Sequence, residues 1–200
     1  MTTSPDVQVR DAAGKSGAAG RLAIRDATPG DMDAVQRIYA HHVENGTATF
    51  EEAAPSVQEM RARLNHITSQ GLPYLVAEQD GVIAGYCYAG QYRQRIAYRY
   101  TLENSIYLDP DQAGKGVGKA LLAALIRRCE QGPWRQMVAV IAGQDNKASV
   151  ALHRSAGFSH VGIQPATGYK FGQWIDVVFM QRALGDGAGT QPEPWMPPQA

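Results

Sequence analysis

The chain has 200 residues, of which 44% are hydrophobic, and its 19 basic residues balance its 19 acidic residues. This length suits a single domain with a sizeable core, and the net charge of zero gives no electrostatic reason to expect nucleic acid or an anionic membrane as a partner. No apolar run approaches the roughly 20 residues of a membrane span, and the N-terminus lacks the apolar core of a signal peptide. We therefore expect a cytoplasmic protein.

The two cysteines, Cys87 and Cys129, stand in a strand-like and a helix-like run. They do not have the spacing of a metal-binding pair, so we expect two buried thiols and no metal ion. Such thiols suit a reducing compartment.

The first predicted elements follow residues 1–20, whose Gly-, Ala- and Ser-rich composition indicates a disordered extension. Residues 22–26 are predicted to form a short strand. A helix then begins at Thr28-Pro29-Gly30-Asp31, where Thr28 can cap and Asp31 can reach back to it. Its apolar face consists of Met32, Val35, Ile38, Tyr39 and Val43.

A second helix and three consecutive strands follow the loop at residues 47–55, which carries Phe50. Ser56 and Glu59 have the spacing of a capping box and predict a helix as far as residue 67. The strands are expected at residues 74–77, 82–92 and 98–108, and a tight turn at residues 79–81 joins the first two.

Residues 105–122 predict a strand, a glycine-rich turn and a helix. Three glycines at alternate positions follow Pro110, and from Val117 the apolar residues recur with helical spacing. Such a turn directs several backbone N–H groups to one place at the positive end of a helix, which suits a phosphate. The spacing is neither that of the usual nucleoside triphosphate loop nor that of a dinucleotide fingerprint. A simple tight connection is the alternative.

The remaining elements are a buried strand at 137–142, a helix from Asn146 to Gly157, and closing strands at 158–163 and 174–180. Residues 185–200 are rich in Pro and Gly and are predicted to be a disordered tail. The order β-α-α-β-β-β-α-β-α-β-β predicts one α/β domain over residues 21–184. We expect a mixed, mostly antiparallel sheet with helices on both faces, not a doubly wound fold.

The glycine-rich turn, the segment at residues 146–158 that ends in Gly-Phe, and the element order together resemble the GNAT superfamily of acyl-CoA-dependent N-acetyltransferases. Within it, the chain most resembles the phosphinothricin and methionine sulfoximine acetyltransferases, over residues 22–184. The more specific marks are residues 100–107 and 168–177. The resemblance implies acetyl-CoA as co-substrate, a small amino acid as acceptor and a homodimer.

The resemblance also implies which residues hold the cofactor. Backbone groups of Ile106, Tyr107 and Leu108 would contact the pantetheine arm and the thioester, and Asn146 would contact the cofactor unless it is only a helix cap. The pyrophosphate would lie on Gly114, Lys115, Gly116, Val117, Gly118 and Lys119. The superfamily usually has Gln or Arg where this chain has Ala113, so we expect weakened cofactor affinity at most.

Glu103 is the candidate general base, because acetyl transfer requires the acceptor amine to lose a proton. Residue type alone favours a surface carboxylate paired with Arg99 or Arg95, and it is the resemblance of residues 100–105 to the family's Tyr-Thr-x-Glu-x-Ser stretch that favours the base. His153 stands where many members of the superfamily have a tyrosine that protonates the departing thiolate; a structural histidine is the alternative.

The acceptor site is predicted from Phe50, Tyr98 and two arginines, Arg93 and Arg99, which could clamp a carboxylate or a phosphinate. His41 is a further candidate for its lining. Two other functions stay open. One is a GNAT enzyme for another small amine or a protein N-terminus, and the other is a non-catalytic acyl-CoA-binding module.

Overall fold

The structure is a computed structural model that describes residues 22–143 and 146–196. The extension predicted at residues 1–20 lies outside the described residues. Helices and strands follow one another as β1 (Leu22–Asp26), α1 (Met32–Asn45), α2 (Val57–Ser69), β2 (Tyr74–Gln79), β3 (Val82–Gln91), β4 (Thr101–Leu108), α3 (Val117–Glu130), β5 (Gln136–Ala142), α4 (Lys147–Ser155), β6 (Ser159–Lys170) and β7 (Gln173–Ala183). This order confirms the prediction from the sequence.

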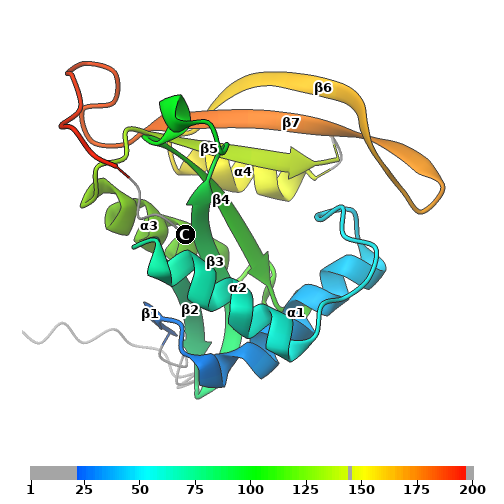
Figure 1. Cartoon of the computed structure of the whole chain (residues 1–200). Coiled ribbons are helices and arrows are strands. Elements are labelled where there is room, and N and C mark those ends of the chain that lie inside the picture. Colours follow the sequence, from blue (N-terminus) through cyan, green and yellow to red (C-terminus); the bar gives the residue numbers. More distant parts are fainter. Residues whose placement is uncertain (1–21, 144–145, 197–200) are drawn as a thin grey trace, which may run out of the picture.

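Seven strands form one sheet in the order β1-β2-β3-β4-β5-β7-β6. Only the β4–β5 pair is parallel among these neighbours, so the sheet is mixed and mostly antiparallel. One face is covered by α1 and α2, which Figure 1 shows together on the same side of β2–β4. The other face is covered by α3, whose apolar residues are buried against alternate residues of β2 and β3.

The start of α1 is a capping box, as predicted. The side chain of Asp31 accepts hydrogen bonds from the backbone N–H of Thr28 at 2.7 Å and from its hydroxyl at 2.8 Å. Residues 29–31 form a 3-10 turn, and the α-helix begins at Met32. The cap matters for the site because α1 carries the side chains that lie under the end of β4.

The strands β4 and β5 pair only over residues 101–104 and 136–139. Beyond those residues each strand continues, but the two diverge and the sheet opens between them. Figure 1 shows the β5–β7 part of the sheet running across the direction of β1–β4. This opening is the place where a ligand can reach backbone groups that a continuous sheet would use for itself.

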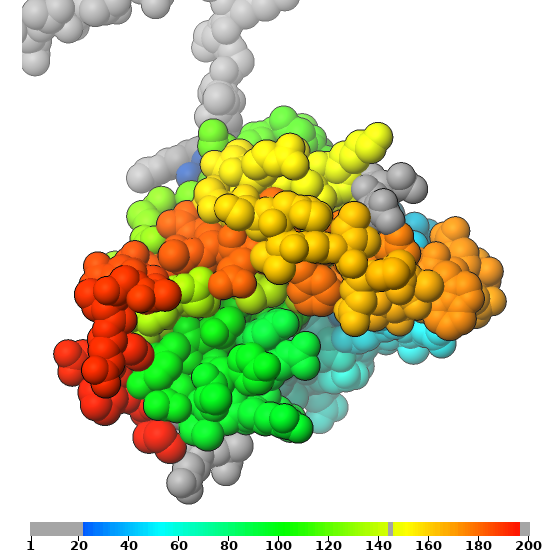
Figure 2. All heavy atoms as spheres, turned by 90° about the horizontal axis from the view of Figure 1, so that it is seen from above, coloured from blue at the N-terminus to red at the C-terminus, as the bar shows by residue number. Residues whose placement is uncertain are grey.

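The β6–β7 hairpin is longer than the sequence predicts. Residues 164–173, expected to lie outside the strands, belong mostly to β6 and β7, and pairing extends to Lys170 and Gln173. Figure 2 shows this hairpin, in yellow and orange, as a ridge that extends beyond the rest of the molecule.

The tail predicted to be disordered is described as far as residue 196, and its residues Glu193 and Trp195 contact the domain. Trp195 packs edge-on against Trp134, with ring centroids 5.9 Å apart. The hydroxyl of Tyr100 donates to the carbonyl of Glu193 at 3.0 Å and accepts from the N–H of Trp195 at 3.2 Å. Figure 2 shows the segment, in red, beside the green chain around residue 100.

Candidate active site

The opening between β4 and β5 continues into a cleft of about 720 Å³. Its walls come from the ends of the two strands, the glycine-rich turn, α4 and the loop after α1. Residues from five separate parts of the chain therefore meet at one place, and the predicted base and most of the predicted cofactor residues are among them. The predicted site residues in the lining are Phe50, Glu103, Ile106, Tyr107, Leu108, Gly114, Gly116, Gly118, Lys119, Asn146 and His153.

The register of β4 determines which of its backbone groups face the cleft. The N–H of Asp109 bonds to Ala84 and the carbonyl of Thr101 accepts from Tyr92, so the odd-numbered residues of β4 direct their backbone groups to β3. Ile106 and Leu108 consequently direct theirs into the opening. Tyr107 does not, although the resemblance implied it. It contributes to the cleft wall without offering its backbone N–H.

The glycine-rich turn requires glycine at two positions for conformational reasons. Gly114 has φ 76° and Gly116 has φ 84°, in the left-handed region, and no atom lies within 4 Å of where a Cβ would be on either residue. Gly116 is the N-cap of α3, so the positive end of the helix faces the cleft. The turn has room for an anion as well as donors for it.

The other residues of the turn divide into two groups. Val117 is buried in the core, and Gly118 allows close packing, because a Cβ there would lie 3.3 Å from the side chain of Leu108. Lys119 lines the cleft, whereas Lys115 is exposed outside the lining. Ala113 lines the cleft without a polar side chain, at the position where the superfamily usually has a donor.

Asn146 acts as the N-cap of α4. Its side-chain oxygen accepts from the N–H of Ser149 at 3.2 Å. The residue also lines the cleft, and its amide N–H₂ is a separate group from the capping oxygen. Asn146 can therefore cap α4 and contact the cofactor at the same time.

Glu103 lies on β4, half-buried at the cleft. Burial raises the pKa of its carboxyl above the ordinary value, and the positive charge of Arg93 acts in the opposite direction. A carboxylate with a raised pKa is a stronger proton acceptor than an exposed one. The geometry and the electrostatics of Glu103 both suit a general base.

His153 is 2% exposed, and both of its ring nitrogens have partners. Nδ1 lies 2.8 Å from the carbonyl of Ser149, and Nε2 lies 2.9 Å from the side-chain oxygen of Asn104. Asn104 in turn donates to the carbonyl of Val138 at 3.1 Å. Asn104 was not singled out in the sequence, where a polar residue on a strand gives no sign that it ties β4, β5 and α4 together.

His42 is a second residue of the cleft that sequence reasoning missed. Its Nε2 donates to the carbonyl of Leu108 at 2.8 Å, and burial lowers the pKa of its ring. The neighbouring His41, which was the candidate, is exposed and not part of the lining. Helical periodicity could have distinguished them, since His42 follows two buried residues, Ile38 and Tyr39, by four and three positions, whereas the residue four positions before His41 is the exposed Arg37.

The four predicted acceptor residues are not all brought together. Phe50 lines the cleft, whereas Arg93, Tyr98 and Arg99 belong to the loop between β3 and β4, outside that lining. Arg93 lies over the rings of Tyr92 and Tyr98, at 5.1 and 5.9 Å from their centroids. The guanidinium of Arg99 lies over the ring of Tyr100, at 4.6 Å, in the direction of the C-terminal segment.

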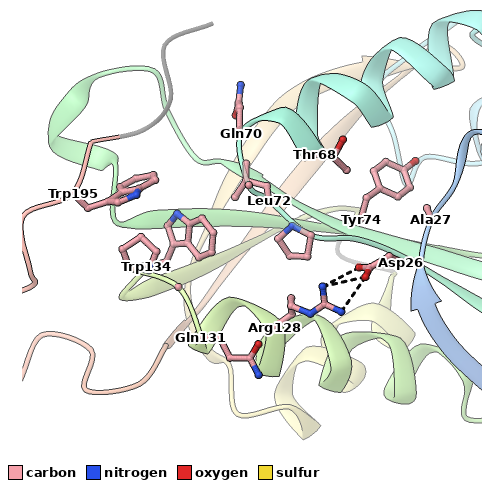
Figure 3. Close-up of a pocket in the computed structure, with 14 residues that line it drawn as sticks. Asp26, Ala27, Thr68, Gln70, Leu72, Tyr74, Arg128, Gln131, Trp134 and Trp195 are labelled. Atoms are coloured by element: carbon pink, nitrogen blue, oxygen red, sulfur yellow. Dashed lines mark hydrogen bonds and ion pairs between the residues drawn. The ribbon is translucent and has the colours of Figure 1, made fainter.

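A second hollow of about 600 Å³ lies elsewhere, between the C-terminal ends of α2 and α3. Figure 3 shows Arg128 across its floor in an ion pair with Asp26, and the rings of Trp134 and Trp195 at one side. None of the predicted catalytic residues lines it. Over the described ranges of the chain, no group of three or more His, Cys, Asp or Glu side chains could hold a metal ion, and no helix could span a membrane.

Comparison with known proteins identifies the family to which the chain belongs. Residues 24–179 match the family of GNAT acetyltransferase domains. The chain is 52% identical to a phosphinothricin N-acetyltransferase of Alcaligenes faecalis, over 85% of this chain and 86% of the relative. It is 37% identical to an L-methionine sulfoximine/L-methionine sulfone acetyltransferase of Salmonella typhimurium, over 84% and 97%.

The fold agrees with that of a solved relative. The crystal structure of a GNAT superfamily phosphinothricin acetyltransferase from Sinorhizobium meliloti, in complex with AcCoA, has a TM-score of 0.83 and 48% identity. The match covers 86% of this chain and 93% of the other. The chain belongs to the GNAT superfamily of acetyltransferases, as the resemblance predicted.

Proposed function

We propose that the protein transfers the acetyl group of acetyl-CoA to the α-amino group of a small amino acid, such as phosphinothricin, methionine sulfoximine or methionine sulfone. The observation that carries this proposal is the half-buried Glu103 in a cleft whose other end is the glycine-rich turn. The names of the relatives support the acceptor class.

The residues of the cleft divide the work between binding and proton transfer. The turn at residues 114–119 holds the pyrophosphate with backbone N–H groups and with Lys119. The backbone N–H groups of Ile106 and Leu108 bind the pantetheine arm and stabilise negative charge on the thioester oxygen. Acetyl-CoA supplies the activated acetyl group. Glu103 accepts the proton of the amine, directly or through a water.

His153 is the proposed source of the proton for the departing thiolate. Nε2 lies against the side-chain oxygen of Asn104, so this role requires Nε2 to carry the proton and to exchange Asn104 for the thiolate. His153→Gln tests this role. If His153 donates the proton, the substitution changes the pH dependence of kcat. If His153 is purely structural, the substitution changes the stability alone.

The experiment measures release of free CoA from acetyl-CoA with phosphinothricin, methionine sulfoximine, methionine sulfone, a polyamine and a peptide. Wild type is compared with Glu103→Gln, and with Glu44→Gln as a control, since Glu44 is exposed on α1. We expect fast release with the first three compounds. That release should fall by about 100-fold or more in Glu103→Gln, because a general base contributes that much.

Other outcomes would lead to other functions. Release with only the polyamine or the peptide would keep the fold and the cofactor but replace the acceptor. Binding of acetyl-CoA without release for any acceptor would favour the non-catalytic binding module. Arg93 lies outside the lining of the cleft, but its positive charge acts on Glu103. Arg93→Ala should therefore raise the KM for the acidic acceptors and leave that of acetyl-CoA unchanged.

We also infer a homodimer in which the β6–β7 hairpin contacts a second copy. β6 is the outermost strand of the sheet, and an open edge can accept another strand. Large apolar side chains are exposed on the hairpin: Val161, Ile163, Tyr169, Phe171 and Trp174. Light scattering should give the mass of a dimer for wild type and of a monomer for Val161→Glu combined with Ile163→Glu.

Cytoplasmic location is proposed on the state of the two thiols. Cys87 and Cys129 are both buried and free. A chain with unpaired thiols suits a reducing compartment. Fractionation of cells that produce the protein should recover it with the cytoplasmic enzymes.

A further inference from the structure

The loop after α1 carries Phe50 to the cleft, and a buried lysine from the other end of the chain holds this loop. Residues 46–52 are called the acceptor loop below. Lys170, on β6, is 2% exposed. Its Nζ donates to the carbonyls of Val43 at 2.7 Å, Gly46 at 3.0 Å and Thr49 at 2.9 Å. An ammonium has three N–H donors, so this side chain uses all of them on α1 and the acceptor loop.

Burial lowers the pKa of the Lys170 ammonium, and the negative charges of Glu52 and Glu51 act in the opposite direction. The carbonyl partners offset part of the cost of burying the charge. Val43 belongs to the last turn of α1, whose carbonyls lack partners in the helix and form the negative end of its dipole. Hydrogen bonds from a charged donor are stronger than those between neutral groups. The ammonium therefore satisfies carbonyls that would otherwise be buried without a donor. Figure 1 shows the chain after α1 rising towards the β6–β7 hairpin.

Gly168, two residues before Lys170, makes the second contact between the hairpin and the loop. A Cβ on Gly168 would overlap the ring of Phe50. Gly168 is not among the residues with positive φ, so its backbone would accept another residue. The space that the aromatic ring occupies is what requires glycine here.

The acceptor loop is also held by side chains of α1 and α2. The hydroxyl of Tyr39 donates to Glu51 and bonds to the hydroxyl of Thr49, each at 2.9 Å. Arg63 donates to both carboxylate oxygens of Glu51, at 2.7 and 3.0 Å. These bonds fix Thr49 and Glu51, on either side of Phe50 in the sequence. The contacts to Lys170 and Gly168 then determine how far Phe50 extends into the cleft.

We propose that Lys170 and Gly168 are positioning residues that fix Phe50 at the acceptor end of the cleft and thereby set which amines fit beside Glu103. The proposal rests on the proposed function. It predicts a specific kinetic effect: changes at the hairpin alter the KM for the acceptor, although the hairpin residues themselves need not touch it. Binding of acetyl-CoA depends on the turn and β4, so it stays as in wild type.

The test is a double-mutant cycle between Gly168→Ala and Phe50→Ala. Gly168→Ala alone should raise the KM for methionine sulfoximine by about tenfold or more, since small displacements in a site are costly. In the Phe50→Ala background the same change should have little further effect, because the ring that it displaces is gone. Gly162→Ala is the matched control, since it lies on the same strand and a Cβ there meets open space.

The second measurement does not depend on the acceptor. Lys170→Met removes the three donors but keeps the length of the side chain, and hydrogen exchange of the amides in residues 46–52 should become faster. Exchange in α3 and β5 should not change. If wild type acetylates none of the amino acids, the proposed function fails, and the exchange result still tests whether Lys170 holds the acceptor loop.

The proposal is overturned by either of two results. One is a Gly168→Ala effect on the acceptor KM that persists undiminished in Phe50→Ala. The other is unchanged exchange of the acceptor loop in Lys170→Met. If Lys170→Met fails to fold, the double-mutant cycle decides alone.

Discussion

Tyr39 and Tyr86 both lie against the ring of Tyr107, but their hydroxyls have different surroundings. The hydroxyl of Tyr39 has two partners, whereas that of Tyr86 is buried and has none. A buried hydroxyl without a partner costs about 1–3 kcal/mol of stability. The two residues therefore give a matched pair for a test of stability.

We predict that Tyr86→Phe leaves the free energy of unfolding unchanged or raises it by up to about 1 kcal/mol, because it removes an unpaired polar atom. Tyr39→Phe should lower it by about 1–2 kcal/mol, because the substitution leaves Thr49 and Glu51 without their donor or acceptor. Urea unfolding of both variants measures the difference. Marked destabilisation by Tyr86→Phe would show that its hydroxyl has a partner in solution.

Glu103 gives the pH dependence of the reaction. It acts as a base only when ionised, and burial raises its pKa above the ordinary 4.5. Activity should therefore be lost, as the pH falls, at a higher pH than an ordinary carboxyl would give. A profile of kcat/KM against pH should contain this limb together with the limb of the acceptor amine. In Glu103→Gln only the amine limb should remain, at a greatly reduced rate.

At the scale of the element, the turn between β4 and α3 lacks one donor. Ala113 lines the cleft, whereas Gln112 lies one residue earlier and outside the lining. Ala113→Arg should lower the Kd for acetyl-CoA several-fold, because an arginine there adds N–H donors to the anion site. Gln112→Arg, the control, should change the Kd little. Calorimetric titration of each variant with acetyl-CoA measures the Kd. Equal decreases in Kd for the two variants would mean that only the net charge matters.

The elements themselves could be predicted from the sequence where local signals are strong. Caps such as Thr28 and the glycines of the turn mark boundaries by chemistry that acts within a few residues. The β6–β7 hairpin could not be predicted in full, since Gly168 and Gly172 indicate a loop when read locally. Pairing across the strands determines the outcome there, and pairing is not a local property.

In the candidate site too, features that depend on local sequence could be predicted, and features that depend on distant contacts could not. Glu103 and the glycine-rich turn are near in sequence, so the strand and helix patterns placed them together. The ring of Phe50 lies against Gly168 of β6, and the guanidinium of Arg99 lies over the ring of Tyr100. Contacts between distant parts of the chain have no signature in either segment alone.

At the scale of the molecule, a residue near the C-terminus packs against the domain. Trp195 contacts both Trp134 and Tyr100. Trp195→Ala should lower the free energy of unfolding by about 1–2 kcal/mol, since it uncovers apolar surface of a partly buried aromatic pair. Met196→Ala, at a side chain that is 68% exposed, should have no measurable effect. Denaturant titration followed by circular dichroism compares the two, and equal stabilities would show that the segment contributes nothing.

The burial of both cysteines has a practical consequence for following turnover. Cys87 and Cys129 are 0% exposed, and burial raises the pKa of the Cys87 thiol well above its usual range and that of Cys129 to about 12. Since the thiolate is the reactive form, a coloured thiol reagent should not label the native chain. In a reaction mixture such a reagent would register only the newly formed CoA, without a protein background. Added to a variant at rising urea, the same dye would count two thiols as the domain opens, so one reagent serves as both the assay and the check on folding.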